Sequence, residues 1–508
     1  MGNPVLRFLS SFLSQLLPSS LRLRWGLIVV LLLHVLLSAA IGLSVDEAHY
    51  ALYAAHPAWS YFDHPPLVGW VQWPLVALNA PVIVLRLIPG ALWLATVLIV
   101  HRIAERLYVG AGVGALLCLL LAPLLHVLAI GLLPDTLLMF FSAALMYQTL
   151  LLMQSDAASA WRHWLVLGAL LGLAGLSKYT AIFTAVAVAA CLVRAHGWQV
   201  LRSTKLWVSF VIAVVLVLPV AYWNAQNQWI SFTYQAKHGA GGGWQALHVA
   251  RFLVVQVLAY GVLLWWGWAG VRSVPSGKLR WLLGFFLVPF AVFAVLSGGG
   301  SGLPHWTAPA WVALAPLAGV GLAQALQNSQ RGWVVTAISV QALLCVLLPV
   351  VMASGGMPWM EGRVASAQSS DPPNPFADLH GWDAAGATAL RLAQAQGLDS
   401  VSVQNWTLGS RMGWYARPLQ VHVLEDRFDQ FDLWAGDLPT GGSTLLVDWS
   451  QMSYEVPLGA HGFAQCTPLA QQTVRKLGYA LAEFRFFACT GWSGNPQPRL
   501  RHDNGGQP

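Results

Sequence analysis

Acidic side chains are rare in the first 352 residues of this 508-residue chain, and their positions point to chemistry. Only six occur there, and four of them, Asp46, Glu47, Asp63 and Asp135, lie beside long apolar segments. A carboxylate close to hydrocarbon is costly, and it is usually functional. When partly desolvated, it can act as a general base or bind a cation. The pattern predicts a reaction centre where these carboxylates gather.

The composition identifies the apolar segments as membrane spans. Hydrophobic residues make up 57% of the chain and charged residues 9%, and the mean hydropathy is +0.60. These values exclude a disordered chain and a single water-soluble domain. We predict a polytopic α-helical membrane protein with about eleven transmembrane helices. The expected spans are residues 25–42, 81–100, 111–128, 136–153, 163–177, 180–194, 206–222, 251–271, 281–297, 307–325 and 332–352.

Basic residues predict the orientation of these spans. Of the 17 in the first 352 residues, 13 fall before the first span and in alternate loops, and the other side has only Arg86, Lys178, Lys237 and Arg251. The positive-inside rule makes the richer side cytoplasmic, so the N-terminus lies inside and the four carboxylates face outward. These topology signals account for the formal charge of +7. Nucleic acid is not an expected partner.

The distribution of polar residues divides the chain into parts. Fourteen of the 20 acidic residues come after residue 352, so the C-terminal part has ordinary polarity. Its alternating helix-like and strand-like patterns predict a small soluble α/β or α+β domain, with a helix over 384–396 and strands over 400–403 and 444–447. The expected parts are a cytoplasmic amphipathic segment (1–24), a transmembrane domain (25–352) with its first outer loop (43–80), a linker (353–375), the outer α/β domain (376–490) and a disordered tail (491–508).

The first outer loop opens with the Asp46-Glu47 pair. Adjacent residues of a helix point about 100° apart, so only one of the two can face a given pocket. Asp46 can serve as a base or cation ligand, or it can cap the following helix, and the residues alone leave both open. Aromatic residues of the loop, Tyr61 among them, can form an interfacial belt or a surface that stacks on sugars.

Several motifs then occur in an order that resembles a known family. The acidic pair is followed by Tyr61-Phe62-Asp63-His64-Pro65-Pro66, Leu133-Pro134-Asp135, Leu176-Ser177-Lys178-Tyr179 and Leu303-Pro304-His305-Trp306. The series resembles glycosyltransferase family 39, the bacterial polyprenyl-phosphate-sugar transferases that are related to protein O-mannosyltransferases and to the aminoarabinose transferases of lipid A. The likeness covers most of the chain and implies a GT-C fold.

The resemblance also implies a reaction. Such enzymes take a sugar from a polyprenyl (undecaprenyl) phosphate and pass it to a periplasmic acceptor, such as lipid A or lipopolysaccharide, another glycan or a protein, typically by an inverting displacement. The step needs a base for the acceptor proton and cations for the departing phosphate. Asp46 matches the catalytic acidic position and is the expected base. Asp135 matches the second acidic motif and is expected to bind the acceptor, position Asp46 or share a divalent cation with it. No cofactor is required, although such a cation is compatible with the two carboxylates.

The remaining candidates are expected to bind substrate. Lys178 can contact phosphate or be an interfacial lysine. His64 stands where the aminoarabinose transferases have a lysine, so we expect the phosphate contact or the sugar preference to differ here. His305 can be a ligand or a structural loop residue, and Glu47 can orient Asp46 or serve the structure. The other candidate contacts are Tyr61, Asp63, Tyr179, Lys237 and His238.

The cysteines and the rival functions complete the expectations. Cys466 and Cys489 lie in the outer domain, where an oxidising periplasm would favour a disulfide between them. The expected location is the bacterial inner membrane, among membrane lipids. A transporter or lipid-linked-sugar flippase, or a scaffold without activity, would also account for a polytopic chain. The lack of an internal repeat and the gathering of acids at one face favour the enzyme.

Overall fold

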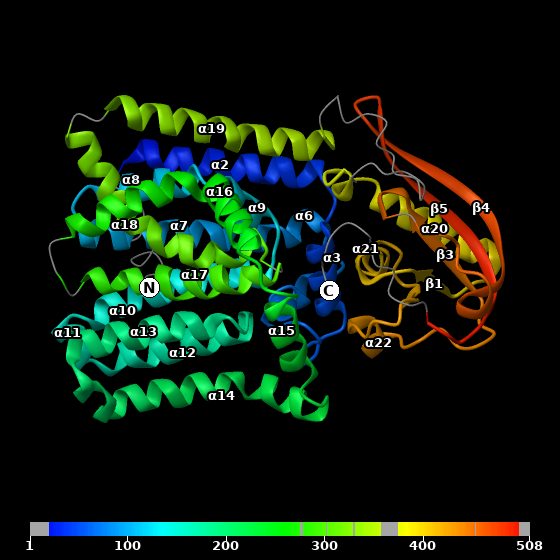
Figure 1. The fold of residues 1–508 in the computed structure, drawn as a ribbon, viewed down its shortest axis with the longest axis horizontal. Helices are drawn as coiled ribbons and strands as arrows, with labels where there is room; N and C mark the ends of the chain where they lie inside the picture. Colours follow the sequence, from blue (N-terminus) through cyan, green and yellow to red (C-terminus); the bar gives the residue numbers. More distant parts are fainter. Residues whose placement is uncertain are drawn as a thin grey trace, which may run out of the picture.

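The computed structural model describes residues 20–274, 277, 279–300, 302–328, 331–356, 374–452 and 454–496. The helices from α2 to α19 form a bundle. A smaller domain built around a sheet lies against one end of that bundle (Figure 1). We call this end of the bundle the site face. The expected segment 1–24, linker 353–375 and tail 491–508 lie mostly outside the described residues.

Eight helical segments of the described chain are long and apolar enough to cross a membrane, as predicted for a polytopic helical protein. The pair α8 and α9 would form a ninth span, with a bend of 75° between the two helices. The bend lies at Pro123, the first residue of α9, because a proline inside a helix breaks the backbone hydrogen bonding. The shorter α12 and α13 fall where two further spans are expected, so the count of eleven stays a prediction. The eight segments are α2 (Leu21–Ala40), α6 with α7 (Val82–Leu85 and Leu87–Leu107), α10 (Pro134–Leu152), α14 (Thr204–Gln226), α16 (Ala246–Ser273), η2 to η3 around α17 (Leu279–Gly299, with α17 at Gly284–Leu296), η4 with α18 (Pro304–Thr307 and Ala308–Gln327) and α19 (Arg331–Ser354).

Shorter elements connect these spans. Figure 1 places α3 and α15 at the site face and α11 at the opposite end of the bundle. The bounds are α3 (Val45–Ala55), α4 (Leu67–Trp70), α5 (Trp73–Ala77), α8 (Ala111–Leu120), α9 (Pro123–Ile130), α11 (Ser155–Ser159), α12 (Trp161–Ser177), α13 (Ala181–His196), η1 (Trp198–Arg202) and α15 (Ile230–Ala240).

Glycines allow α16 to lie very close to α18. A side chain at Gly270 would overlap the carbonyl of Leu317 on α18. Small residues permit such an approach between membrane helices. Nearby, Gln256 Oε1 on α16 accepts hydrogen bonds from Thr307 Oγ1 at 2.5 Å and Trp311 Nε1 at 2.7 Å. These contacts fix the start of α18 and, with it, the turn η4.

The C-terminal domain contains a five-stranded sheet with the order β2-β1-β3-β5-β4. β1 (Ser400–Val403) pairs in parallel with β2 (Gln420–Val423) and β3 (Thr444–Trp449), while β5 (Tyr479–Trp492) pairs antiparallel with β3 and β4 (Phe463–Lys476). Its main helices are α20 (Trp382–Gln396), α21 (Trp406–Tyr415) and α22 (Gln430–Trp434). The expected helix and both expected strands are present. Cys466 and Cys489 lie opposite each other on β4 and β5 and form a disulfide.

The helical bundle and the C-terminal domain meet at α3. Just before this helix, the Gly42 amide donates to the Leu379 carbonyl at 2.7 Å, and the Leu43 amide donates to Tyr415 Oη at 2.8 Å. Within it, Leu52 belongs to the same apolar cluster as Met412 of α21. The helix is therefore held from both sides, and its first turn lies at the junction of the two parts.

Candidate functional site

Asp46 lies in the first turn of α3 but does not cap it. The cap is Ser44, whose side chain accepts from the Glu47 amide at 3.3 Å while the Glu47 carboxylate accepts from the Ser44 amide at 3.1 Å. Asp46 is half-buried, and its carboxylate forms no hydrogen bond or ion pair with any described residue. Burial raises the pKa of Asp46, against the opposing effects of His305 and His49. A carboxylate with free oxygens and a raised pKa is suited to accept a proton.

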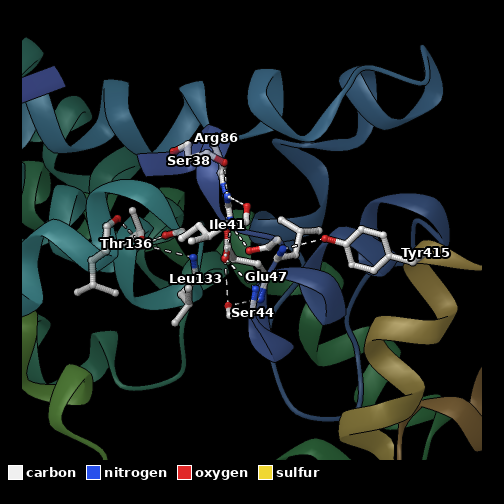
Figure 2. A network of polar contacts seen from close by, with 12 residues as sticks. Ser38, Ile41, Ser44, Glu47, Arg86, Leu133, Thr136 and Tyr415 are labelled. Carbon is white, nitrogen blue, oxygen red and sulfur yellow. Dashed lines mark hydrogen bonds and ion pairs between the residues drawn. The ribbon is translucent and has the colours of Figure 1, made fainter. Parts of the chain in front are cut away.

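Its neighbour Glu47 is enclosed by the protein (Figure 2). Arg86 Nε donates to Glu47 Oε1 at 2.8 Å and Nη2 donates to Oε2 at 3.0 Å. The same guanidinium donates to the carbonyls of Ser38, Ile41 and Gly42 at 2.7–2.9 Å. All five of its N–H groups are therefore used. The pair ties the end of α2 to the starts of α3 and α7, and a substrate contact by Glu47 stays a prediction.

A second carboxylate–cation pair joins α10 to the end of α12. Lys178 Nζ donates to both carboxylate oxygens of Asp135 at 2.7 Å. Asp135 lies in the first turn of α10, where the helix dipole favours a negative charge. His305 Nε2 lies 3.9 Å from Asp135 Oδ2, and Lys178 Nζ lies 5.6 Å from the centre of the Trp306 ring. The third N–H of Lys178 has no acceptor among the described residues, so the ammonium can bind an added anion.

Asp63 of the first outer loop forms a cluster with α3. Its carboxylate accepts a hydrogen bond from Tyr53 Oη, and its Oδ1 lies 3.7 Å from His49 Nε2. Burial opposes ionisation of this carboxyl, but the hydrogen bonds and the nearby His49 and His64 outweigh it and hold the pKa of Asp63 well below its ordinary range. The Asp63 carboxyl therefore favours its ionised form, and its charge acts on Asp46.

His64 is a neutral polar group at the same face. Burial lowers the pKa of His64 to about 4, although Asp63 favours its charged form. Its Nδ1 is buried and has no hydrogen-bond partner among the described residues. The ring meets Tyr50 edge-on, with 5.5 Å between the centroids. A neutral imidazole can still donate to or accept from a ligand, and the expected difference in phosphate contact stays a prediction.

The other predicted contacts lie around this centre. Tyr61 stacks on Tyr53, with 3.6 Å between the rings, and Tyr179 Oη lies 3.4 Å from Ser60 Oγ, so both tyrosines support the loop. On α15, the His238 ring lies 5.5 Å from the ring of Trp306, which also faces Lys178, and Lys237 is exposed. The structure thus gathers the predicted residues at one face, while their roles toward substrate stay predictions.

Apolar cavities lie along α16 and α19, and we call them together the α16–α19 groove. It consists of two cavities of about 770 Å³ and 560 Å³ that follow one another along these helices. Trp265 and Trp333 line the first cavity, and Pro304, the residue before His305, lines the second. Leucine and valine side chains make up most of the remaining walls, so the groove suits a hydrocarbon chain.

Three polar residues near the site were not predicted as site residues. His49 follows Asp46 by three positions, which places both on one face of α3, and this spacing could have revealed it. Ser410 and Asp429 come from the C-terminal domain, and no spacing in the sequence links them to Asp46. Among the described residues, no group of three or more His, Cys, Asp and Glu side chains could hold a metal ion.

Comparisons with known proteins agree with this architecture. Residues 63–223 match the family described as Dolichyl-phosphate-mannose-protein mannosyltransferase. Crystal structures of ArnT from Cupriavidus metallidurans, one bound to undecaprenyl phosphate and one in the apo state, superpose with a TM-score of 0.61 over 94% of this chain and 100% of theirs, at 18% and 19% identity. The chain has the fold of ArnT.

A curated relative extends this likeness at the level of sequence. The lipid A galacturonosyltransferase RgtD of Rhizobium johnstonii is 24% identical over 287 residues, which are 53% of this chain and 58% of the relative. The match therefore spans little more than half of that protein. The shared fold confirms the predicted GT-C architecture, and the sequence match agrees with the family resemblance that the motifs predict.

Proposed function

We propose that this ArnT-like chain transfers a sugar from a polyprenyl phosphate to a lipid A-type acceptor at the outer face of the bacterial inner membrane. The observation that carries the proposal is the contrast on α3, where Asp46 has free oxygens and a raised pKa while the adjacent Glu47 is enclosed. One of the two ArnT crystal structures contains undecaprenyl phosphate, and RgtD is a lipid A galacturonosyltransferase. The proposed donor and the proposed acceptor are therefore of the same classes as those named for these two similar proteins.

The step itself follows from the chemistry of the site. The acceptor oxygen attacks the anomeric carbon of the sugar, and the bond from that carbon to the phosphate oxygen breaks. The proton of the acceptor hydroxyl passes to Asp46, and the electron pair of the broken bond stays on the phosphate. Lys178, with an N–H still free among the described residues, balances the charge that develops there. His305 and His64 are the neighbouring groups that can hydrogen-bond sugar or phosphate oxygens.

The α16–α19 groove supports a lipid-linked donor. Pro304, beside His305, lines one of its two cavities, so a hydrocarbon tail that lies there would bring its phosphate toward the site face. Loop charges orient this face outward by the positive-inside rule. The C-terminal domain, which packs on α3, would then lie in the periplasm and cover the site from the acceptor side.

A transfer assay tests the proposal. Purified protein is given radiolabelled undecaprenyl-phosphate monosaccharides with lipid A or a membrane extract as acceptor, and labelled products are separated by chromatography. The wild type should transfer label, and Asp46→Asn should lower kcat by about 10³-fold, since removal of a general base costs about 10²–10⁴-fold. Because the base must be ionised, kcat/KM should rise with pH through a pKa above the ordinary value for aspartate of about 4.

Two controls sharpen the assay. Asp399→Asn removes an exposed acid of the C-terminal domain and should keep full activity. Binding of undecaprenyl phosphate to Asp46→Asn, measured in parallel, shows that the variant is folded. Full activity of Asp46→Asn would refute Asp46 as the base. Movement of labelled donor across a vesicle membrane without transfer to any acceptor would instead support a flippase.

A further inference from the structure

The turn between β4 and β5 lies beside the site-face ends of two membrane spans. Lys476 Nζ donates to the carbonyl of Ala40, the last residue of α2, at 3.4 Å. A side chain at Gly355, which follows α19, would overlap the side chain of Leu481 on β5. In Figure 1, the ends of α2 and α19 lie next to the C-terminal domain on this side of the molecule. The turn therefore lies at the depth where both helices leave the membrane.

The two helices face lipid at this point. Only 22% of the apolar stretch of α2 and 17% of that of α19 are buried inside the protein, so most of their side chains are directed toward the bilayer. Headgroups and water surround the end of such a helix. A turn of the C-terminal domain that reaches both ends is therefore in a position to contact the headgroups of the leaflet next to the site face.

The side chains of this turn suit a membrane interface. We call residues 475–479 the hairpin tip. Arg475 and Lys476 are basic, and neither forms an ion pair with an acid of the described chain. Leu477 is 76% exposed, and Tyr479 is partly exposed. Basic side chains attract anionic headgroups, tyrosine is enriched where membrane meets water, and an exposed leucine can enter the boundary of the acyl chains.

The backbone of the hairpin tip gives independent support. Lys476 pairs with Tyr479, so Leu477 and Gly478 form a two-residue turn. Their φ angles are 50° and 90°, and a type I′ turn requires such left-handed backbone at both positions. Asparagine or glycine suits the first position, whereas a leucine is disfavoured there. Because Leu477 is exposed, packing within the described chain does not compensate this strain, and its apolar side chain suits a partner outside the chain.

We propose that the hairpin tip is a surface by which the C-terminal domain binds the phospholipid bilayer. Leu477 enters the boundary between headgroups and acyl chains, while Arg475 and Lys476 bind the phosphates of anionic phospholipids. This contact holds the edge of the domain on the membrane, in addition to the contacts that α3 makes with α21. The domain that covers the site face is thereby held at two places. The inference does not depend on the transferase activity.

Fluorescence of the full-length protein in lipid nanodiscs tests the contact. Leu477→Cys is labelled with nitrobenzoxadiazole in a Cys345→Ala background, since the remaining cysteines are buried or joined in the disulfide. The nanodiscs contain equal parts of phosphatidylglycerol and phosphatidylcholine. We expect emission at a shorter wavelength than in water, and quenching by lipids that carry a nitroxide near the headgroup.

A matched position controls for insertion driven by the label itself. Leu458 is 57% exposed and precedes β4, at the opposite end of the hairpin from the tip. A label on Leu458→Cys should emit as in water and should escape quenching. Emission as in water from position 477 as well, or equal quenching at both positions, would overturn the proposal.

Two further variants test the parts of the contact separately. Arg475→Glu, with the label at position 477, should lose quenching in these nanodiscs, because each basic residue near an anionic surface strengthens binding about fivefold. Unchanged quenching would contradict the headgroup contact. Leu477→Asn should keep or raise Tm in detergent, because asparagine suits the left-handed turn. A lowered Tm would show that Leu477 packs within the protein, and it would overturn the proposed insertion into lipid.

Discussion

Two buried carboxylate–cation pairs lie at the site face, and they differ in how fully they are satisfied. In the Glu47–Arg86 pair, the guanidinium uses all five donors on the carboxylate and three backbone carbonyls. In the Asp135–Lys178 pair, the ammonium uses two of its three donors, and its surroundings are His305 and the Trp306 ring. The first pair leaves nothing for a ligand, whereas the second can accept an anion.

The difference distinguishes an ion pair that only stabilises the fold from one that can also bind a charged substrate. Burial of an ion pair is costly and is compensated only when the remaining hydrogen-bond capacity is used. Arg86 achieves this by closing the ends of α2, α3 and α7 around itself. Lys178 uses only two of its three N–H groups within the protein. The cost of burying its charge is fully compensated only if a substrate phosphate accepts the third. Substitutions in the two pairs should therefore affect different properties of the protein.

Within the comparison of the two pairs, the largest effect is expected from Asp135→Asn. The amide oxygen can still accept from Lys178, so the fold should persist, but the charge that positions the ammonium is lost. We expect kcat/KM for the polyprenyl-phosphate sugar to fall by about 10²–10³-fold, as for the removal of one preorganised electrostatic group. Tm should also fall, because the buried ammonium loses its counterion. A variant with unchanged kcat/KM would place Asp135–Lys178 in the same structural class as Glu47–Arg86.

Glu47→Gln should have the opposite signature. Removal of one partner of a buried ion pair costs about 3–5 kcal/mol, because the other charge is left unpaired. We expect the free energy of unfolding to fall by about 3 kcal/mol, with kcat of the folded fraction changed little. Thermal unfolding in detergent, followed by transfer assays below the transition, measures both. The double variant Glu47→Gln with Arg86→Met should recover part of the loss, and a further loss instead would contradict the structural role.

Much of this arrangement could be predicted from the sequence because it depends on local signals. Apolar runs of membrane-spanning length predicted the bundle, and alternating patterns predicted the helix at 384–396 and the strands near 400 and 444. Asp46 could be selected as a candidate because an acid directly after a span is costly. The sequence could not decide whether Asp46 or Ser44 caps α3, since both are good caps. The capping box with Glu47 decides it.

The remainder depends on contacts between distant segments. No spacing in the sequence pairs Arg86 with Glu47, yet the two form an ion pair, because the end of α2 and the start of α3 turn toward Arg86. Ser410 and Asp429 reach the site only through the packing of α21 and α22 at the junction. Such pairings carry no periodicity or spacing that a single sequence reveals.

Asp429 extends the comparison to a buried carboxylate without any cation paired to it in the described chain. Its Oδ1 accepts from the Phe431 amide at 2.7 Å and caps α22, while Oδ2 has no partner among the described residues. Burial raises the pKa of Asp429 to about 7. In the unfolded chain the value is about 3.9, so between about pH 4 and 7 the native state holds the extra proton and stability falls as pH rises.

Asp429→Asn should therefore stabilise the protein in a pH-dependent way, the smallest of the three effects. Asparagine also caps helices well, so the contact with the Phe431 amide can persist while the buried charge is removed. We expect a gain of about 1–2 kcal/mol at pH 8 that shrinks toward zero near pH 4, after allowance for solvent screening. Tm of the variant and of the exposed control Asp399→Asn, measured at both pH values, checks this. An equal shift at both pH values would mean that the charge of Asp429 is compensated in the native protein, as it is in the Glu47–Arg86 pair.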